Sequence, residues 1–194
     1  MPISNKIYEK SLDRNLTVYH GIFPHWKELK IKELIEDYRS NNPESSKSNV
    51  KSWHSAWNAH VIEPRFNELV DVCAQFIYSG VGWKRFPNEI TLIDCWCMQY
   101  DVGNYAVEHC HWPLTFACTY YADVGEGSSP LRFSDSALYP DGFEIKPENG
   151  MIIAFDALTK HYVPPTDSPR SCVAMNYQVL PPKDSEPIHP KEES

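Results

Sequence analysis

The hydrophobic period of this 194-residue chain changes near its middle, and that change limits the folds it can adopt. Up to Gly80 and Gly82, apolar residues recur at helical spacing. From Ile90 onward they form short β-branched, aromatic or alternating runs, separated by Gly, Pro, Asp and Ser. Helices followed by short strands indicate an α+β fold whose core is an antiparallel sandwich or jelly roll.

Two helices are expected in the first half. Pro24 is a plausible start for the first, which ends near residues 41–43, and Pro64 can occupy the first turn of the second. Residues 44–52 are rich in Ser, Lys and Asn and are expected to form a mobile surface loop. The buried stripe of the second helix is predicted to be Phe66, Leu69, Val70, Cys73, Phe76 and Ile77.

Five strands are expected in the second half, over residues 90–100, 114–122, 131–133, 151–155 and 171–180. At 22.4 kDa and 42% hydrophobic content, the chain suits one domain, which we place at residues 1–180. Residues 181–194 carry prolines and charges without an apolar period, and are expected to be a flexible tail.

The charge and cysteine content narrow the partners and the compartment. A net charge of −8 and a pI near 5.4 argue against a broad grip on nucleic acid or anionic lipid. No run is long and apolar enough to cross a membrane. The six cysteines lie mostly in apolar stretches, and no secretory segment is evident, so we expect free thiols in a reducing, cytoplasmic protein.

Three histidines and an arginine in the strand half have the pattern of a metal site. Alternate residues of a strand share a face, so His109 and His111 are expected to direct both imidazoles at one point. His161 lies in a second strand-rich segment, and Arg170 near the start of the last strand can fork onto a carboxylate. Neutral imidazoles suit Fe(II), Zn(II), Ni(II) or Cu(II), and the spacing does not choose among them.

These residues belong to a longer motif that resembles the iron(II)/2-oxoglutarate-dependent oxygenases. The resemblance covers roughly residues 98–178 and is nearest to the prolyl-hydroxylase-like branch and to small, often phage-encoded oxygenases with a His-x-His motif. The matching residues are Tyr100, Gly103, Tyr105, His109, His111, Tyr120-Tyr121, Gly127 to Leu131, Phe133, Pro147 to Gly150, Phe155, His161, Val163, Pro165, Arg170 and Asn176.

The resemblance implies a double-stranded β-helix (jelly roll) core, here with the N-terminal helices packed on one sheet. It implies Fe(II), O2 and the co-substrate 2-oxoglutarate, with hydroxylation of a small molecule or a peptidyl residue. Arg170 would bind the distal carboxylate of 2-oxoglutarate, and Tyr105, or else Tyr100, would donate its hydroxyl to that carboxylate. The implied metal ligands are His109, His111 and His161, with no catalytic residue beyond them.

His111 departs from the family pattern, because that position usually holds Asp or Glu. The site therefore has either three His ligands, or His111 outside the coordination sphere with water or a distant carboxylate completing it. Asp123 and Asp156 remain open as that carboxylate. Glu108 is a poor substitute, since it adjoins His109 and faces the other side of a regular strand.

Two other classes of protein remain as alternatives. Cupin dioxygenases share Gly-x5-His-x-His, which Gly103 to His111 satisfies, but they require a Glu that residues 113–119 lack. A jelly-roll binding or structural module would have incidental histidines or a closed, four-coordinate zinc site. Outside the motif, Trp112 is a candidate wall of the substrate pocket, and residues 41–52 and 134–141 are candidate lids. Residues 53–60 hold two histidines on opposite helix faces, which predicts packing or a lid rather than a metal site.

Overall fold

A computed structural model of the chain describes residues 10–13, 16–46, 48–81, 89–134 and 142–180. The predicted tail lies outside these ranges, as does nearly all of the candidate lid over residues 134–141. The helices are α1 (Ile31–Asn41), α2 (Ala59–Ile62), the 3-10 turn η1 (Pro64–Phe66) and α3 (Asn67–Val81). The strands are β1 (Lys10–Asp13), β2 (Leu16–Ile22), β3 (Val50–Lys51), β4 (Trp53–His54), β5 (Glu89–Tyr100), β6 (Tyr105–His109), β7 (Phe116–Val124), β8 (Leu131–Phe133), β9 (Phe143–Ile145), β10 (Met151–Asp156), β11 (His161–Val163) and β12 (Arg170–Leu180).

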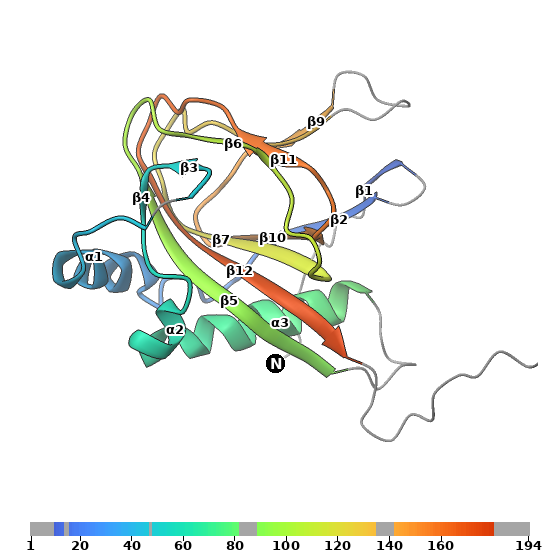
Figure 1. The fold of residues 1–194 in the computed structure, drawn as a ribbon, viewed down its shortest axis with the longest axis horizontal. Coiled ribbons are helices and arrows are strands. Elements are labelled where there is room, and N and C mark those ends of the chain that lie inside the picture. The colour runs from blue at the N-terminus through green and yellow to red at the C-terminus, as the bar shows by residue number, and fades with distance from the viewer. Residues whose placement is uncertain (1–9, 14–15, 47, 82–88, 135–141, 181–194) are drawn as a thin grey trace, which may run out of the picture.

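Two antiparallel sheets face each other, and the helices cover the outer face of the larger one (Figure 1). The larger sheet has the strand order β1-β2-β10-β7-β12-β5-β4, and the smaller has the order β3-β6-β11-β8-β9. The predicted α+β jelly roll with N-terminal helices packed on one sheet is confirmed.

The larger sheet has a hydrophobic core on each of its faces, because alternate residues of a strand point to opposite sides. In β12, Val173 and Met175 pack toward the helices, whereas Cys172 and Ala174 face the smaller sheet. This alternation assigns one face of β5, β7 and β12 to the scaffold and leaves the other face for a site between the sheets.

The second predicted helix is confirmed in position and in buried face. Pro64 opens η1, which leads directly into α3, and α3 ends at Val81. All six predicted stripe residues are buried against the larger sheet. The hydroxyl of Tyr177 on β12 donates to the carbonyl of Val70 over 2.9 Å, which fixes the helix to the sheet.

The first helix begins later than predicted, at Ile31 rather than near Pro24. Residues 24–30 form turns in which the Trp26 and Glu28 amides bond to carbonyls three residues back. Lys30 then adopts a left-handed conformation with φ of 48°, which a continuous α-helix excludes. The apolar spacing continued across this break, so the period alone placed the helix start too early.

Residues 44–52 are not only a surface loop. Val50 and Lys51 form β3 and pair with Ala106 and Tyr105 of β6. Val50 is buried between the sheets. A two-residue strand is too short to show an alternating pattern, which is why composition predicted only a loop.

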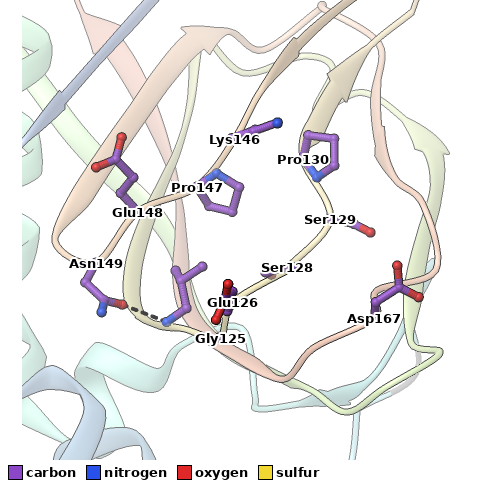
Figure 2. A pocket seen from close by; sticks show the side chains of 12 residues that line it. Gly125, Glu126, Ser128, Ser129, Pro130, Lys146, Pro147, Glu148, Asn149 and Asp167 are labelled. Carbon is purple, nitrogen blue, oxygen red and sulfur yellow. Dashed lines mark hydrogen bonds between the residues drawn. The ribbon is translucent and has the colours of Figure 1, made fainter.

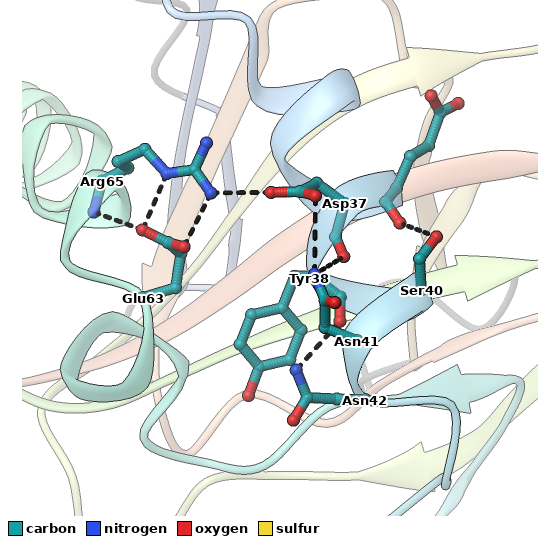
Figure 3. Close-up of polar contacts among 8 residues, drawn as sticks. Asp37, Tyr38, Ser40, Asn41, Asn42, Glu63 and Arg65 are labelled. Carbon is teal, nitrogen blue, oxygen red and sulfur yellow. Dashed lines mark hydrogen bonds and ion pairs between the residues drawn. The ribbon is translucent and has the colours of Figure 1, made fainter.

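One surface cluster of charges ties α1 to the turn that precedes α3 (Figure 3). The Arg65 guanidinium donates to both carboxylate oxygens of Glu63 and to Asp37 on α1. Hydrogen bonds from the Arg65 side chain and backbone lower the pKa of Glu63 to about 2.

The six cysteines are free, as predicted, and five of them are buried as small apolar side chains. Within the described ranges, no helix has the length and apolar character needed to cross a membrane.

Candidate metal centre

The three predicted histidines meet in one cavity between the two sheets. His109 ends β6, His161 begins β11, and the two residues lie directly opposite each other in the antiparallel ladder. With His111 they place their ligand nitrogens within 4.8 Å of one another. Among the residues that the structure describes, this is the one group of three or more His, Cys, Asp or Glu side chains arranged in this way.

His111 reaches the cavity by a different route from the one predicted. It lies beyond the end of β6, so the alternation of a regular strand does not place it. Its backbone amide instead donates to the Ala157 carbonyl over 2.7 Å, and its carbonyl accepts from Leu114 over 3.0 Å. A turn anchored to the end of β10 therefore presents the third imidazole.

The hydrogen bonds of the histidines leave metal-facing nitrogens free. Nδ1 of His109 bonds to the Val107 carbonyl over 2.8 Å, and Nδ1 of His161 bonds to the Thr159 carbonyl over 2.9 Å. A carbonyl only accepts, so each Nδ1 carries the proton and each Nε2 keeps a lone pair.

The three imidazoles are neutral. Burial lowers the pKa of His109, and burial together with His109 lowers that of His111 to about 4. Burial and the other two imidazoles lower the pKa of His161. Neutral imidazole is the form that binds a metal, so no proton has to be displaced from Nε2 of His109 or His161 at physiological pH.

The spacing of these nitrogens suits a single ion. Nε2 of His111 and Nε2 of His161 lie 3.3 Å apart. Two nitrogens each about 2.0–2.1 Å from one metal are about 2.8–3.4 Å apart for right-angled to tetrahedral coordination. The donor set therefore fits a divalent transition metal.

The carboxylates left open by the sequence are engaged elsewhere. Asp123 pairs with Lys32 over 2.8 Å, and Asp156 accepts from the Leu158 amide over 2.8 Å. Glu108, on the outer side of β6, contacts Ser134 and pairs with Lys160. None of the three lines the histidine cavity.

Arg170 lies in the same cavity as the histidines, as its position in the sequence predicted. It is 2% exposed and donates to the Ser129 carbonyl over 2.7 Å. Its Nε has no acceptor, and in the described ranges no carboxylate lies within ion-pair distance. A buried guanidinium without an anionic partner is costly, so this geometry favours an anionic ligand.

Two tyrosines contact Arg170, and only one of them was predicted. The guanidinium carbon lies 4.4 Å from the ring centre of Tyr100 and 5.6 Å from that of Tyr121. Burial raises the pKa of both phenols, so both remain protonated. Tyr121 belongs to the sequence motif, but the sequence predicted no function for it. Its alternation with Ala117 and Thr119 along β7 was the available signal.

Tyr105, which was favoured over Tyr100, is not brought to the cavity. It is 37% exposed and does not line the cavity. The cause is an irregularity in the ladder, where His161 pairs with His109 but Val163 pairs with Ala106. Three residues of β6 thus match two of β11, and this extra residue changes which side chains face inward. Ala106 and His109 both line the cavity as a result.

Trp96, rather than Trp112, forms the aromatic wall beside the metal ligands. Trp112 is 74% exposed and does not line the cavity. Trp96 is 3% exposed, lines the cavity, and lies with its ring centre 5.8 Å from that of His111. His54 stacks on the Trp96 ring, with the two ring centres 5.9 Å apart, and is fully buried, so the packing role predicted for this segment is confirmed at His54.

Asn176, the last polar residue of the motif, contributes to the sheet rather than to the cavity. Its side-chain amide donates to the carboxylate of Asp94 on the paired strand over 3.0 Å. It does not line the histidine cavity.

A second pocket of about 720 Å³ is lined by residues 124–130, residues 146–149 and Asp167 (Figure 2). Its wall includes Lys146 and three carboxylates, those of Glu126, Glu148 and Asp167. Ser129 lines this pocket, and its carbonyl accepts the Arg170 hydrogen bond. None of the three histidines lines it.

Sequence comparison does not identify relatives of the chain, because no family model and no curated protein matches it. Solved structures with the same fold do match. A prolyl-4-hydroxylase from Pseudomonas putida has a TM-score of 0.60 at 11% identity, covering 90% of this chain and 93% of that one. The α-ketoglutarate-dependent epimerase SnoN of nogalamycin biosynthesis has a TM-score of 0.61 at 15% identity, covering 89% and 88%.

A third match is a viral collagen prolyl hydroxylase from Paramecium bursaria Chlorella virus-1, solved as its 2-oxoglutarate complex. Its TM-score is 0.56 at 16% identity, covering 81% of this chain and 94% of that one. At these identities the likeness establishes the fold, and function depends on the residues of the site.

Proposed function

We propose that this chain is an iron(II)/2-oxoglutarate-dependent oxygenase that hydroxylates an organic substrate. The observation that carries the proposal is the content of one cavity. It holds three neutral imidazoles, of which His109 and His161 each have a lone pair on Nε2, and a buried arginine without an anionic partner among the described residues. The oxygenase fold of the similar structures agrees with this proposal.

In this proposal His109, His111 and His161 hold Fe(II), and Arg170 holds the far carboxylate of 2-oxoglutarate. When bound, the iron and 2-oxoglutarate together turn O2 into an oxidant for a C–H bond, with succinate and CO2 as the co-products. Two side chains of the chain prepare the co-substrate site. Tyr100 and Tyr121 fix the Arg170 guanidinium by cation–π contact, and they supply neutral hydroxyls near the carboxylate.

The backbone contacts of the ligands hold the imidazoles in place before a metal arrives. The carbonyls of Val107 and Thr159 orient two of the rings and set their tautomer. Phe155 packs edge-on against His161 at 4.7 Å and excludes water from its face. The chain thus supplies orientation and a dry environment, while the oxidising chemistry belongs to the cofactors.

The cavity itself has a volume of about 40 Å³, far below the roughly 300–1,000 Å³ of ordinary small-molecule sites. Binding of 2-oxoglutarate therefore requires lining side chains to move. Met98 is suited to this movement, because it lines the cavity beside Tyr100 and its unbranched side chain changes rotamer readily.

One alternative is favoured by the carboxylate-free ligand set. A three-histidine dioxygenase of the cupin type would use O2 without 2-oxoglutarate, and Arg170 would then hold the carboxylate of the substrate itself. A jelly-roll module with a structural zinc is less well supported, because such sites are closed by four ligands. The described residues bring three together.

The test is anaerobic addition of Fe(II) and then 2-oxoglutarate to the folded protein. We expect a visible charge-transfer band that requires both additions, and succinate after admission of air. Absence of the band and of succinate, together with O2 consumption that requires Fe(II) but not 2-oxoglutarate, would identify the cupin-type alternative. Arg132→Met is the matched control for Arg170→Met in this assay, because Arg132 is a half-exposed arginine on β8 outside the cavity.

A further inference from the structure

One row of side chains beside the histidines ends in a carboxylate. The row crosses β10, β7, β12 and β5, and its paired residues are Phe155, Ala117, Asn176 and Asp94. Phe155 and Ala117 pack in the core between the two sheets, so the row lies on the inner face of the larger sheet. The rings of Phe155 and His161 lie 4.7 Å apart between centres. The row therefore adjoins the candidate metal centre.

Asp94 lies at the end of the site opposite to Arg170. Its partner Asn176 is six residues beyond Arg170 on β12, which is about 20 Å at about 3.3 Å per residue. Trp96 stands one row nearer to Arg170 than Asp94 does, and its ring centre is 5.8 Å from that of His111. A carboxylate of 2-oxoglutarate held by Arg170 occupies one side of the histidines, which leaves the Asp94 side for the substrate.

The Asp94 carboxylate is partly buried and has no cationic partner in the described ranges. It accepts a hydrogen bond from the Asn176 side-chain amide over 3.0 Å, which fixes its position but adds no charge. His60 lies close enough to interact with Asp94, but burial lowers the pKa of His60, so this imidazole is neutral at pH 7. The negative charge of Asp94 is therefore uncompensated, which favours a cationic ligand.

The hydrogen-bonding groups of this pair favour the same kind of ligand. Asn176 is 3% exposed, and its side-chain oxygen has no donor among the described residues. An amide oxygen and a carboxylate accept hydrogen bonds and cannot donate them. The pair therefore suits a ligand that brings N–H donors and disfavours an anionic one.

Trp57 adds an aromatic face next to the carboxylate. Its carbonyl accepts a hydrogen bond from the Cys95 amide over 2.8 Å, which holds Trp57 against β5 next to Asp94. The Trp57 ring lies 4.6 Å from the Trp96 ring between centres and is 41% exposed. An indole face attracts a cation, as a carboxylate does, so the two groups favour the same ligand.

We propose that Asp94 binds a cationic nitrogen group of the substrate, such as a guanidinium, and that the Trp57 indole packs against this group. The group binds the protein and not the metal, so it does not compete there with 2-oxoglutarate or O2. This inference rests on the proposed function, which supplies the reaction. It narrows the substrate to compounds that carry a cationic nitrogen group a few bonds from the C–H bond to be oxidised.

The test compares n-butylguanidinium with n-butylurea, which is its neutral analogue of nearly the same shape. Each probe is titrated with protein loaded with Co(II) and saturating 2-oxoglutarate, and the NMR line widths of the probe are measured. Zn(II)-loaded protein is the diamagnetic control. We expect n-butylguanidinium to bind at least tenfold more tightly than n-butylurea. Its lines should broaden far more with Co(II) than with Zn(II), because the probe lies beside the histidines.

Three variants assign the binding to the proposed residues. Asp94→Asn keeps the shape of the side chain and removes its charge, and should weaken n-butylguanidinium at least tenfold, as for loss of a hydrogen bond between charged groups. Asp71→Asn makes the same change at an exposed position on α3 and should leave the affinity unchanged. Trp57→Leu should weaken n-butylguanidinium about threefold, as for an exposed cation–π contact.

Equal affinity of the wild type for n-butylguanidinium and n-butylurea would refute the cation site, and this comparison needs no variant to fold. Equal broadening with Co(II) and Zn(II) would place the probe away from the histidines and would also overturn the proposal. An equal loss in Asp71→Asn and Asp94→Asn would show an effect of overall charge, with the same consequence.

The 2-oxoglutarate affinity of the same samples, measured by calorimetry, separates this failure from failure of the proposed function. Normal 2-oxoglutarate binding without a preference for n-butylguanidinium overturns the cation site alone. Absence of 2-oxoglutarate binding in the metal-loaded wild type overturns the proposed function. Binding of n-butylguanidinium that is lost in Asp94→Asn would still support the cation site in that case.

Discussion

Replacing Arg170 with Met separates a ligand-binding arginine from a structural one. Breaking an ordinary buried ion pair costs about 3–5 kcal/mol, because it leaves the partner charge uncompensated. Arg170 has no such partner in the described part of the chain, so its removal leaves no opposite charge uncompensated. In other proteins, replacing buried ionic groups with hydrophobic residues is neutral or stabilises by up to about 1–4 kcal/mol. Two losses act in the opposite direction. The unpaired Ser129 carbonyl destabilises the variant by about 1–3 kcal/mol, and loss of the cation–π contacts destabilises it by about 0.5–2 kcal/mol.

These contributions nearly cancel, so Arg170→Met should change the unfolding free energy of the ligand-free protein by no more than about 1.5 kcal/mol. For a chain of this size, 1 kcal/mol corresponds to about 2–4 °C in Tm, which sets the expected shift at or below about 6 °C. In the metal-loaded wild type, 2-oxoglutarate at 100 times its Kd should add about 2.7 kcal/mol, and in the variant it should add nothing.

The assay is thermal unfolding of the Ni(II)-loaded protein with and without 2-oxoglutarate. Arg132→Met serves as the control and should keep the full stabilisation by 2-oxoglutarate. If ligand-free Arg170→Met has an unfolding free energy more than about 3 kcal/mol below that of wild type, the arginine is structural. Stabilisation of that variant by 2-oxoglutarate would show that another residue holds the carboxylate.

Three further predictions test the metal site, the co-substrate site and the surface cluster. His161→Ala should weaken Co(II) binding at least about 100-fold by equilibrium dialysis, while Glu108→Gln leaves it unchanged, because ligands and their supports typically change metal affinity by about 10–100-fold or more. Tyr121→Phe should weaken 2-oxoglutarate binding measured by calorimetry without changing Co(II) affinity, and an equal loss of both would contradict its placement at Arg170. Glu63→Gln should lower Tm at pH 7. Because the folded-state pKa of Glu63 is depressed to about 2, this difference should disappear as the pH falls from about 4.5 to about 2, and a difference that persists at pH 2 would refute the ion-pair explanation.

Local patterns were sufficient to predict the parts of the fold that depend on regular periods. The stripe from Phe66 to Ile77 recurs at helical spacing on one face of α3, and the long strands β5 and β12 are rich in β-branched and aromatic residues. Such elements bury a continuous face, so their composition reports their environment. The start of α1 was not predictable in this way, because one left-handed residue, Lys30, interrupts a period that otherwise continues.

The site was predictable in its residue types and less so in its geometry. His109, His161 and Arg170 were placed by their spacing, and the structure brings them to one cavity. The exclusion of Tyr105 from the cavity follows from an extra residue in β6, and strand alternation counts residues without registering such an insertion. Val50 joined the cavity through a two-residue strand that only tertiary pairing stabilises.

The position of His111 explains how this chain can differ from the oxygenase pattern that its sequence resembles without a change of fold. His109 and His161 are paired across a ladder, so their backbone and side-chain directions are fixed by β6 and β11. His111 follows the strand, and its backbone amide bonds to Ala157 whatever side chain it carries. Imidazole in place of a carboxylate therefore changes the charge at the metal while the hydrogen bonds that support the turn stay the same. Substitution at this position should therefore change metal affinity far more than it changes the unfolding free energy of the metal-free protein.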